Sequence, residues 1–182
     1  MAKVATEFGS SDEDLLPDFL KGTLPGSVAA SKQHVKRITG VSTEKWWKRS
    51  KRYKRMRAVD PTLPSKAFIT ATGNLSRAQT SVLTQLRTGH APLNQHLHRI
   101  GKRDSPYCQH CPAMVEDVRH LLLFCKRYTI QRHQLTMILK RKANEISHLL
   151  ANPKAIRHTL NFLHSTGRFE YIYGDISTDL GD

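Results

Sequence analysis

The sequence has few acidic residues and no long apolar run. Its 182 residues include 15 aspartates and glutamates against 29 lysines and arginines, a formal net charge of +14. The longest apolar stretch of note, Leu121–Phe124, is far too short to span a bilayer. The first residues, Met1–Thr6, lack the apolar segment of a signal peptide. We therefore expect an intracellular protein that attracts polyanions, with nucleic acid ahead of an acidic membrane surface as the partner.

The residue patterns that catalysis needs are also missing. No nucleophile stands beside a partnered base, no glycine-rich phosphate loop occurs, and no set of carboxylates is arranged to hold two metals. Glu116 and Asp117 are neighbours in the sequence, but consecutive side chains on a helix diverge. We predict that the protein is not an enzyme, and we expect no small-molecule substrate and no membrane partner.

Cysteine is scarce, and its only three copies lie in one segment, Cys108-x2-Cys111-x8-His120-x4-Cys125. A two-residue gap lets a tight turn direct two sulfurs at one ion, and thiolates with an imidazole are typical ligands of tetrahedral zinc. In a reducing compartment such a cluster favours a metal over a disulfide. The alternatives are three buried free cysteines, or His110 as a competing ligand. We predict one structural Zn²⁺ on Cys108, Cys111, His120 and Cys125, because four protein ligands leave no position for water.

This zinc prediction requires a particular backbone conformation between His120 and Cys125. Hydrophobic spacing predicts a helix from about Val115 to Cys125. His120 and Cys125 are five positions apart, about 140° around an ideal α-helix. Both can bind one ion only if the helix ends or unwinds before Cys125. Three thiolates around Zn²⁺ leave a net negative charge, and four nearby cations can offset it: Arg103, Arg119, Lys126 and Arg127.

Periodicity and capping signals predict a mainly α-helical fold, a small helical domain organised around this Cys-Cys-His-Cys knuckle. Ser27 is a suitable N-cap for a helix that stops at Gly40, with Val28, Val35 and Ile38 inside. A second helix is expected from residue 42 or 43 to about Arg57. Its aromatic residues can stack on bases, but their helical spacing favours the core: Trp46, Trp47 and Tyr53.

Further helices are predicted downstream. Ser76 and Gln79 form a capping box for a helix that Gly89 ends, and Pro92 suits the first residue of a short helix. Apolar spacing then predicts helices around residues 130–142, 146–150 and 156–163. We expect a linker at residues 1–26, the helical zinc-knuckle domain at residues 27–169, and a disordered acidic tail at residues 170–182.

Positive charge is concentrated in residues 31–57, which hold eleven basic side chains against one acid, Glu44. Like charges one helical turn apart disfavour an isolated helix, and a polyanion would relieve this repulsion. One alternative is an ordinary solvated helix; another is a nuclear-localisation signal at Lys48–Arg55, which does not exclude nucleic-acid contact. We expect a nuclear protein. The predicted nucleic-acid contacts are Lys45, Lys48, Arg49, Lys51, Arg52, Lys54, Arg55, Arg127, Lys140, Arg141 and Lys142.

Several stretches resemble fungal non-LTR retrotransposon polyproteins of the Tad type, over roughly residues 15–169. They are Leu86–Asn94, Leu97–Ile100, Asp104–Pro106, the knuckle with Glu116–Leu122, Asn152–Ile156 and Thr166–Phe169. That family commonly has Thr where this chain has Asp117, a change that leaves the metal ligands untouched. The resemblance implies a zinc-binding segment that contacts nucleic acid and follows the reverse transcriptase and ribonuclease H domains.

The same resemblance bears on activity. Residues 1–9 look like the end of a ribonuclease H domain, whose metal-binding carboxylates would lie upstream and are not in this chain. The resemblance therefore implies a non-catalytic tail module of such a polyprotein. The alternatives are a structural or protein-interaction role, an inert retroelement fragment, and a ribonuclease H label inherited without its active site.

Overall fold

The computed structural model describes residue 18 and residues 27–179. The chain divides into two compact units, Met1–Trp46 and Trp47–Asp182, and each is described by itself. The first unit contains most of helix α2 (Val28–Arg49), which continues into the second. The predicted ribonuclease H remnant at residues 1–9 and nearly all of the linker at residues 1–26 lie outside the described residues.

Helix α2 begins as predicted but does not stop at Gly40. The Ser27 hydroxyl accepts the Ala30 N–H at 3.1 Å, as an N-cap should. A glycine inside a helix costs only about 1 kcal/mol relative to alanine, and α2 continues through Gly40 to Arg49. The side chains predicted to lie inside are all exposed: Val28, Val35 and Ile38.

The predicted helix from residue 42 or 43 to Arg57 is in fact interrupted. After α2 ends, α3 (Tyr53–Val59) follows a turn in which the Ser50 hydroxyl accepts the Arg52 N–H at 3.2 Å. Such a bond offers the backbone an alternative to the helix. Trp47 contacts Tyr53 edge to face, with ring centroids 5.8 Å apart. The core prediction is wrong for Trp46, which is 73% exposed.

The next helices follow their capping signals. After α4 (Ala67–Thr72), α5 (Arg77–Thr88) starts with the predicted capping box: Ser76 and Gln79 each accept the other's backbone N–H, at 3.2 and 2.9 Å. Gly89 ends α5 in the left-handed conformation, with a φ of 69°. Helix α6 (Asn94–Arg99) starts two residues after Pro92, because the extended Leu93 is its N-cap.

A short antiparallel hairpin and seven further helical segments complete the described fold. The hairpin consists of β1 (Tyr107–Cys108) and β2 (Cys111–Val115), so the helix expected from Val115 starts later. The segments that follow are the π-helix η3 (His120–Phe124), the 3₁₀ turns η4 (Lys126–Tyr128) and η5 (Lys140–Asn144), and the α-helices α7 (Thr129–Leu139), α8 (Ile146–Ala151), α9 (Pro153–Ser165) and α10 (Glu170–Tyr173).

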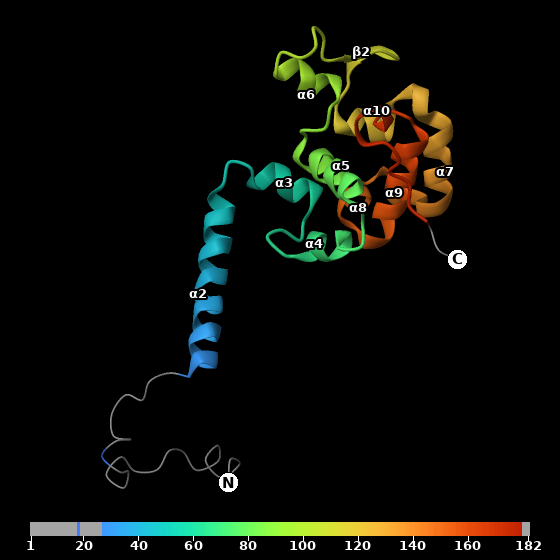
Figure 1. Cartoon of the computed structure of the whole chain (residues 1–182). Coiled ribbons are helices and arrows are strands. Elements are labelled where there is room, and N and C mark those ends of the chain that lie inside the picture. Colours follow the sequence, from blue (N-terminus) through green and yellow to red (C-terminus); the bar gives the residue numbers. More distant parts are fainter. Residues whose placement is uncertain (1–17, 19–26, 180–182) are drawn as a thin grey trace. The chain divides into compact units, whose positions relative to one another are not determined.

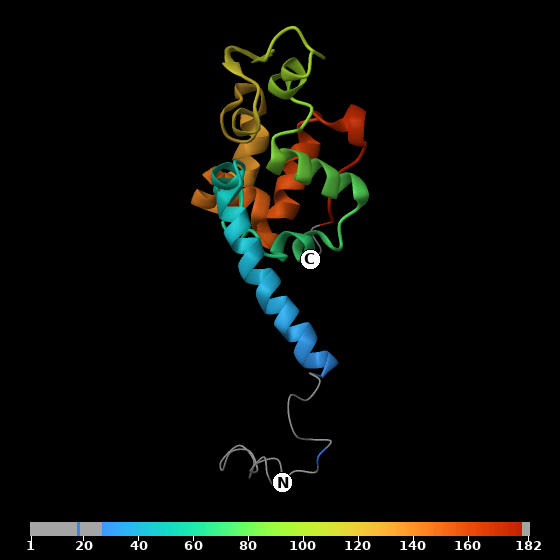
Figure 2. The ribbon, with the colours of Figure 1, turned by 90° about the vertical axis from the view of Figure 1, so that its left-hand side faces the viewer.

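Helix α9 forms the centre of the core in the second unit. It packs against α7 and α8, and α5 lies nearby (Figure 1 and Figure 2). The Asn152 side chain caps it by accepting the Lys154 N–H at 2.9 Å, and Pro153 suits its first position. Its inner face buries six side chains: Ala155, Ile156, Thr159, Leu160, Phe162 and Leu163. The mainly helical fold class is confirmed.

A buried ion pair joins three segments of this core. The Arg87 guanidinium of α5 binds the Asp60 carboxylate that follows α3, and it also donates to the Leu150 carbonyl of α8 at 2.7 Å. Asp60 also accepts the Thr62 N–H at 2.9 Å. Burial alone would raise the pKa of Asp60, but the bonds from Arg87 and Thr62 outweigh it and hold that pKa below its ordinary value.

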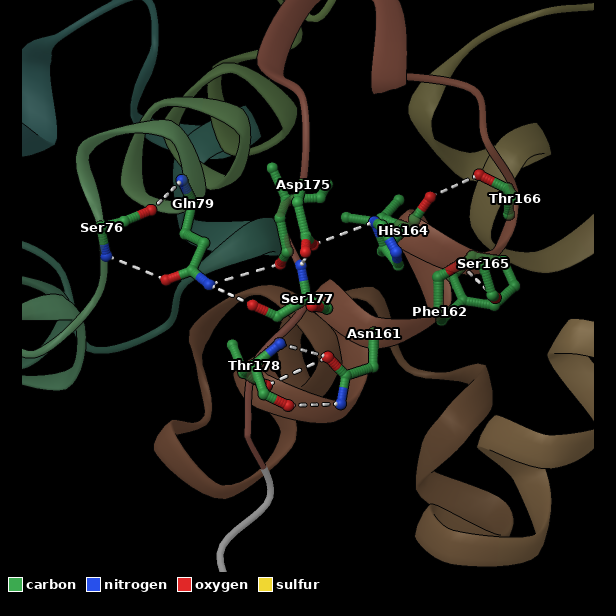
Figure 3. A network of polar contacts seen from close by, with 12 residues as sticks. Ser76, Gln79, Asn161, Phe162, His164, Ser165, Thr166, Asp175, Ser177 and Thr178 are labelled. Carbon is green, nitrogen blue, oxygen red and sulfur yellow. Dashed lines mark hydrogen bonds and ion pairs between the residues drawn. The ribbon is translucent and has the colours of Figure 1, made fainter.

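The described part of the expected acidic tail is packed rather than disordered. Ile176 is only 1% exposed, and the Gln79 amide donates to its carbonyl at 3.4 Å (Figure 3). Asn161 of α9 accepts the Thr178 N–H at 2.6 Å and donates to the Thr178 carbonyl at 3.0 Å. The prediction of a disordered segment from residue 170 is therefore wrong up to residue 179, because a single buried isoleucine and two polar side chains anchor it.

Candidate metal centre

The three cysteines and His120 meet in one compact group. Their four candidate ligand atoms all lie within 4.8 Å of one another. The Sγ atoms of Cys108 and Cys125 are 3.9 Å apart. Two thiolates at about 2.3 Å from a tetrahedral Zn²⁺ would lie about 3.8 Å apart, so this separation suits one ion. The group is compatible with zinc, and the ligand set predicted from the sequence is the set that the fold assembles.

The hairpin supplies the first two ligands. Cys108 ends β1 and Cys111 begins β2, and the two residues pair with each other across the turn. The Gln109–His110 turn thus brings both sulfurs to the same end of the hairpin. His110 is exposed and does not belong to the ligand group; its ring contacts Tyr128 edge to face at 6.4 Å.

A π-turn supplies the other two ligands. Their spacing requires the helix to end or unwind before Cys125. The Cys125 N–H donates to the His120 carbonyl, five residues earlier, at 2.8 Å. This i+5 closure defines a π-turn, a feature frequent at functional sites. Cys125 itself leaves the helix, with φ −59° and ψ 119°. The prediction that the helix unwinds before Cys125 is confirmed.

His120 has the environment of a metal ligand. The residue is 2% exposed, and neither Nδ1 nor Nε2 has a hydrogen-bond partner among the described residues. Unpartnered polar atoms are uncommon in protein interiors and call for an explanation, such as an ion. Burial lowers the pKa of His120, although the nearby Asp117 and Glu116 oppose this shift. The neutral ring therefore keeps a lone pair available for a metal.

A bound cation would also change the protonation state of the cysteine sulfurs. Burial, together with the neighbouring Cys108, raises the pKa of Cys125 to about 11, so its thiol is neutral near pH 7 without a cation. A bound Zn²⁺ deprotonates a coordinating thiol outright. The backbone N–H of Arg127 donates to the Cys125 sulfur and favours the thiolate.

Arg132 is a functional candidate that the sequence did not reveal. From α7, its Nε donates to the Leu122 carbonyl at 3.0 Å and its guanidinium donates to the Cys125 carbonyl at 2.6 Å. It therefore caps carbonyls at the end of η3 and places a positive charge near Cys125 and Cys111. It lies seven residues beyond the last ligand, and no spacing rule points to it.

A second ion pair, between a half-buried arginine and a buried glutamate, joins the metal segment to the helical core. Arg168 binds both oxygens of Glu116, at 2.8 and 2.9 Å, and donates to the Pro92 carbonyl at 3.2 Å. Glu116 also accepts the Asn94 N–H at 2.8 Å. The hydrogen bond to Glu116 is the main reason that the pKa of Arg168 is raised. Three stretches quoted for the retrotransposon resemblance thus meet at one carboxylate.

The predicted nucleic-acid contacts of the second unit are carried by elements that lie apart. Figure 1 shows α3 and α7 on opposite sides of α5, α8 and α9. The fold exposes every one of the predicted cations: Lys45, Lys48, Arg49, Lys51, Arg52, Lys54, Arg55, Arg127, Lys140, Arg141 and Lys142.

No family model, no curated protein and no solved structure matches this chain. The resemblance to Tad-type polyproteins therefore stays a prediction. Among the helices of the described residues, none is long and apolar enough to cross a membrane.

Proposed function

We propose that this chain is a non-catalytic module that binds RNA or DNA and needs one structural Zn²⁺. The compact Cys108–Cys111–His120–Cys125 group carries the metal part of this proposal, since its atoms lie within 4.8 Å of one another and both His120 nitrogens lack partners. Four protein ligands complete a tetrahedral shell, so the ion has no open position for a substrate or a catalytic water.

Charge supports the nucleic-acid part of the proposal. The chain carries +14, and the cations named above are exposed on α2, on the turn that follows it, and on α3, η4 and η5. Neutralising phosphates with such side chains releases counterions, which makes affinity fall steeply with salt and depend little on sequence. The proposal also includes a nuclear location and descent from the tail of a retrotransposon polyprotein.

A structural or protein-interaction role is the second candidate. Exposed apolar side chains on α7 favour it: Ile130, Met137 and Ile138. It predicts the same zinc content and helicity, but an affinity for polyanions no higher than that of an unrelated folded protein with equal charge.

The metal part is tested by zinc content and circular dichroism of the purified chain, before and after a strong chelator. We expect one tightly held zinc per chain, lost in Cys125→Ser together with part of the structure. Ala143→Ser is the matched control, since Ala143 is 1% exposed and belongs to η5 rather than to the ligand group. A metal-free chain with unchanged structure would reduce the cysteines to ordinary core residues.

The nucleic-acid part is tested by fluorescence anisotropy with labelled RNA and DNA across a series of salt concentrations. We expect a logarithmic salt slope that corresponds to several phosphate contacts, and a smaller slope when Lys140, Arg141 and Lys142 are all replaced by glutamine. A folded protein of equal net charge is the reference. Equal affinity and slope for both proteins would favour the second candidate.

A further inference from the structure

A cavity of about 810 Å³ lies in the second unit, beside the metal centre. Residues of α3, α5, α6 and α8 line it, together with Val115 and residues 117–119, which directly precede the candidate ligand His120. Its volume is within the range of about 300–1,000 Å³ typical of small-molecule sites. The buried and half-buried apolar residues of its lining include Val59, Leu86, Val115, Val118, Ile146 and Leu150, and the exposed Ala58 also lines it.

Exposed cationic side chains also line the cavity. Arg55, Arg99 and Arg119 contribute guanidinium groups, and His98 adds an imidazole. The one carboxylate of the lining, Asp117, accepts the His120 N–H at 2.6 Å and so is engaged in capping η3. The lining of the cavity therefore combines apolar side chains with a net positive charge.

This combination matches one unit of a nucleic-acid strand. The face of a base is apolar and can stack on guanidinium planes, while the flanking phosphates are anions that arginine binds. In a duplex the bases are stacked and paired, and extracting one costs a few kcal/mol. A single strand offers the same base at much lower cost.

We propose that this cavity binds an unstacked base of single-stranded nucleic acid, with Arg55, Arg99 and Arg119 on the neighbouring phosphates. The inference rests on the proposed nucleic-acid binding and goes further, because it assigns a site and a preference for single strands. It also gives the metal a second role: Val118 and Arg119 directly precede His120, so the zinc holds one wall of the cavity in place.

The experiment uses the full zinc-loaded chain and fluorescence anisotropy at one fixed salt concentration. Three labelled probes have the same length: oligothymidine, the same backbone without bases, and a duplex. We expect the base-containing single strand to bind about tenfold more tightly than the abasic strand, the order of one base contact. We expect the duplex to bind as weakly as the abasic strand.

Two variants locate this preference. Ala58→Trp places a large side chain in the cavity without changing its charge, and we expect it to remove the tenfold difference. Its matched control is Ala67→Trp, which places the same side chain at a separate cavity of about 260 Å³. A double variant, Arg99→Gln with Arg119→Gln, should weaken all single strands more than the control pair Lys66→Gln with Lys154→Gln. Zinc content and circular dichroism verify that each variant is folded.

The outcomes separate this inference from the proposed function. Equal, salt-dependent binding of the three probes would overturn the cavity site while leaving a general nucleic-acid module. A base preference that survives in Ala58→Trp would also overturn it, by placing the base elsewhere. Displacement of the strand by equimolar free nucleotide would overturn the strand assignment. Failure of the wild-type chain to bind any probe would overturn the site and the proposed function together.

Discussion

The β1–β2 hairpin and helix α9 are stabilised in different ways. Six of the 13 residues of α9 are buried, whereas Cys108 is the one buried residue between Tyr107 and Val115. Burying a large apolar side chain contributes about 1.5–3 kcal/mol, so α9 has a packing energy that the hairpin lacks. A two-stranded hairpin alone is at best marginally stable in water. The comparison indicates that the hairpin depends on its ligands, while the helical core does not.

Removing the metal should give the largest loss of stability, and this loss should affect the hairpin but not the helical core. Zinc binding to such sites contributes on the order of 10–16 kcal/mol, far more than any other contact of the hairpin. After chelation we expect amide protection to disappear from residues 107–125 and to persist in α5, α8 and α9. Hydrogen exchange with mass spectrometry measures this. Loss of protection throughout α9 would show that the core also depends on the ion.

Breaking the Asp60–Arg87 pair should have the opposite result: the helical core should lose stability while the metal centre keeps its zinc. Arg87→Met leaves a buried carboxylate without its cation, which typically costs about 3–5 kcal/mol. We expect urea denaturation to show that loss for the whole helical core, with zinc stoichiometry unchanged while the chain is folded. The double variant Asp60→Leu, Arg87→Met should regain part of the stability, because it leaves no unpaired charge. No recovery would mean that Arg87 acts through packing instead.

The Glu116–Arg168 pair joins the two regions, and its loss should be of intermediate size. Arg168→Met should cost about 2–3 kcal/mol, since Glu116 keeps its bond from the Asn94 N–H but loses its cation. We expect faster hydrogen exchange in the hairpin and smaller changes in α9. Arg77→Met, at the exposed start of α5, is the matched control and should change neither.

Arg132→Met should give the smallest effect, a change in metal affinity alone. Arg132 touches no ligand atom but holds the carbonyls of Leu122 and Cys125. Loss of such outer contacts typically lowers metal affinity about 10–100-fold. Competition with a chelating dye measures this change. Arg127→Met is the control, since it is the backbone N–H of Arg127 that meets the Cys125 sulfur. An unchanged affinity in Arg132→Met would remove its assigned role.

Features set by neighbouring residues were predictable from the sequence. The Ser76 capping box, the end of α5 at Gly89, and the unwinding between His120 and Cys125 each follow from a few adjacent residues and are present as predicted. The four candidate ligands were likewise found from spacing alone, and the fold brings them together.

Features that depend on distant residues were missed. The Glu116–Arg168 contact spans 52 positions, and Asn161 meets Thr178 across 17. No local pattern selects such partners, so the packed segment up to residue 179 was mistaken for a disordered tail. The exposed apolar residues of α2 show the opposite error, since apolar spacing indicates a possible buried face but not a neighbour to bury it.

The π-turn between His120 and Cys125 can also be seen as an insertion. A π-turn is an α-helical turn that has gained one residue, with the extra residue absorbed by the wider ring. Deleting Leu123 would return the segment to i+4 closure, where histidine and cysteine one turn apart share a helix face. A His-x4-Cys spacing with a π-turn and a His-x3-Cys spacing in an ordinary α-helix can therefore present the same pair of donor atoms. A search for related chains should accept both lengths.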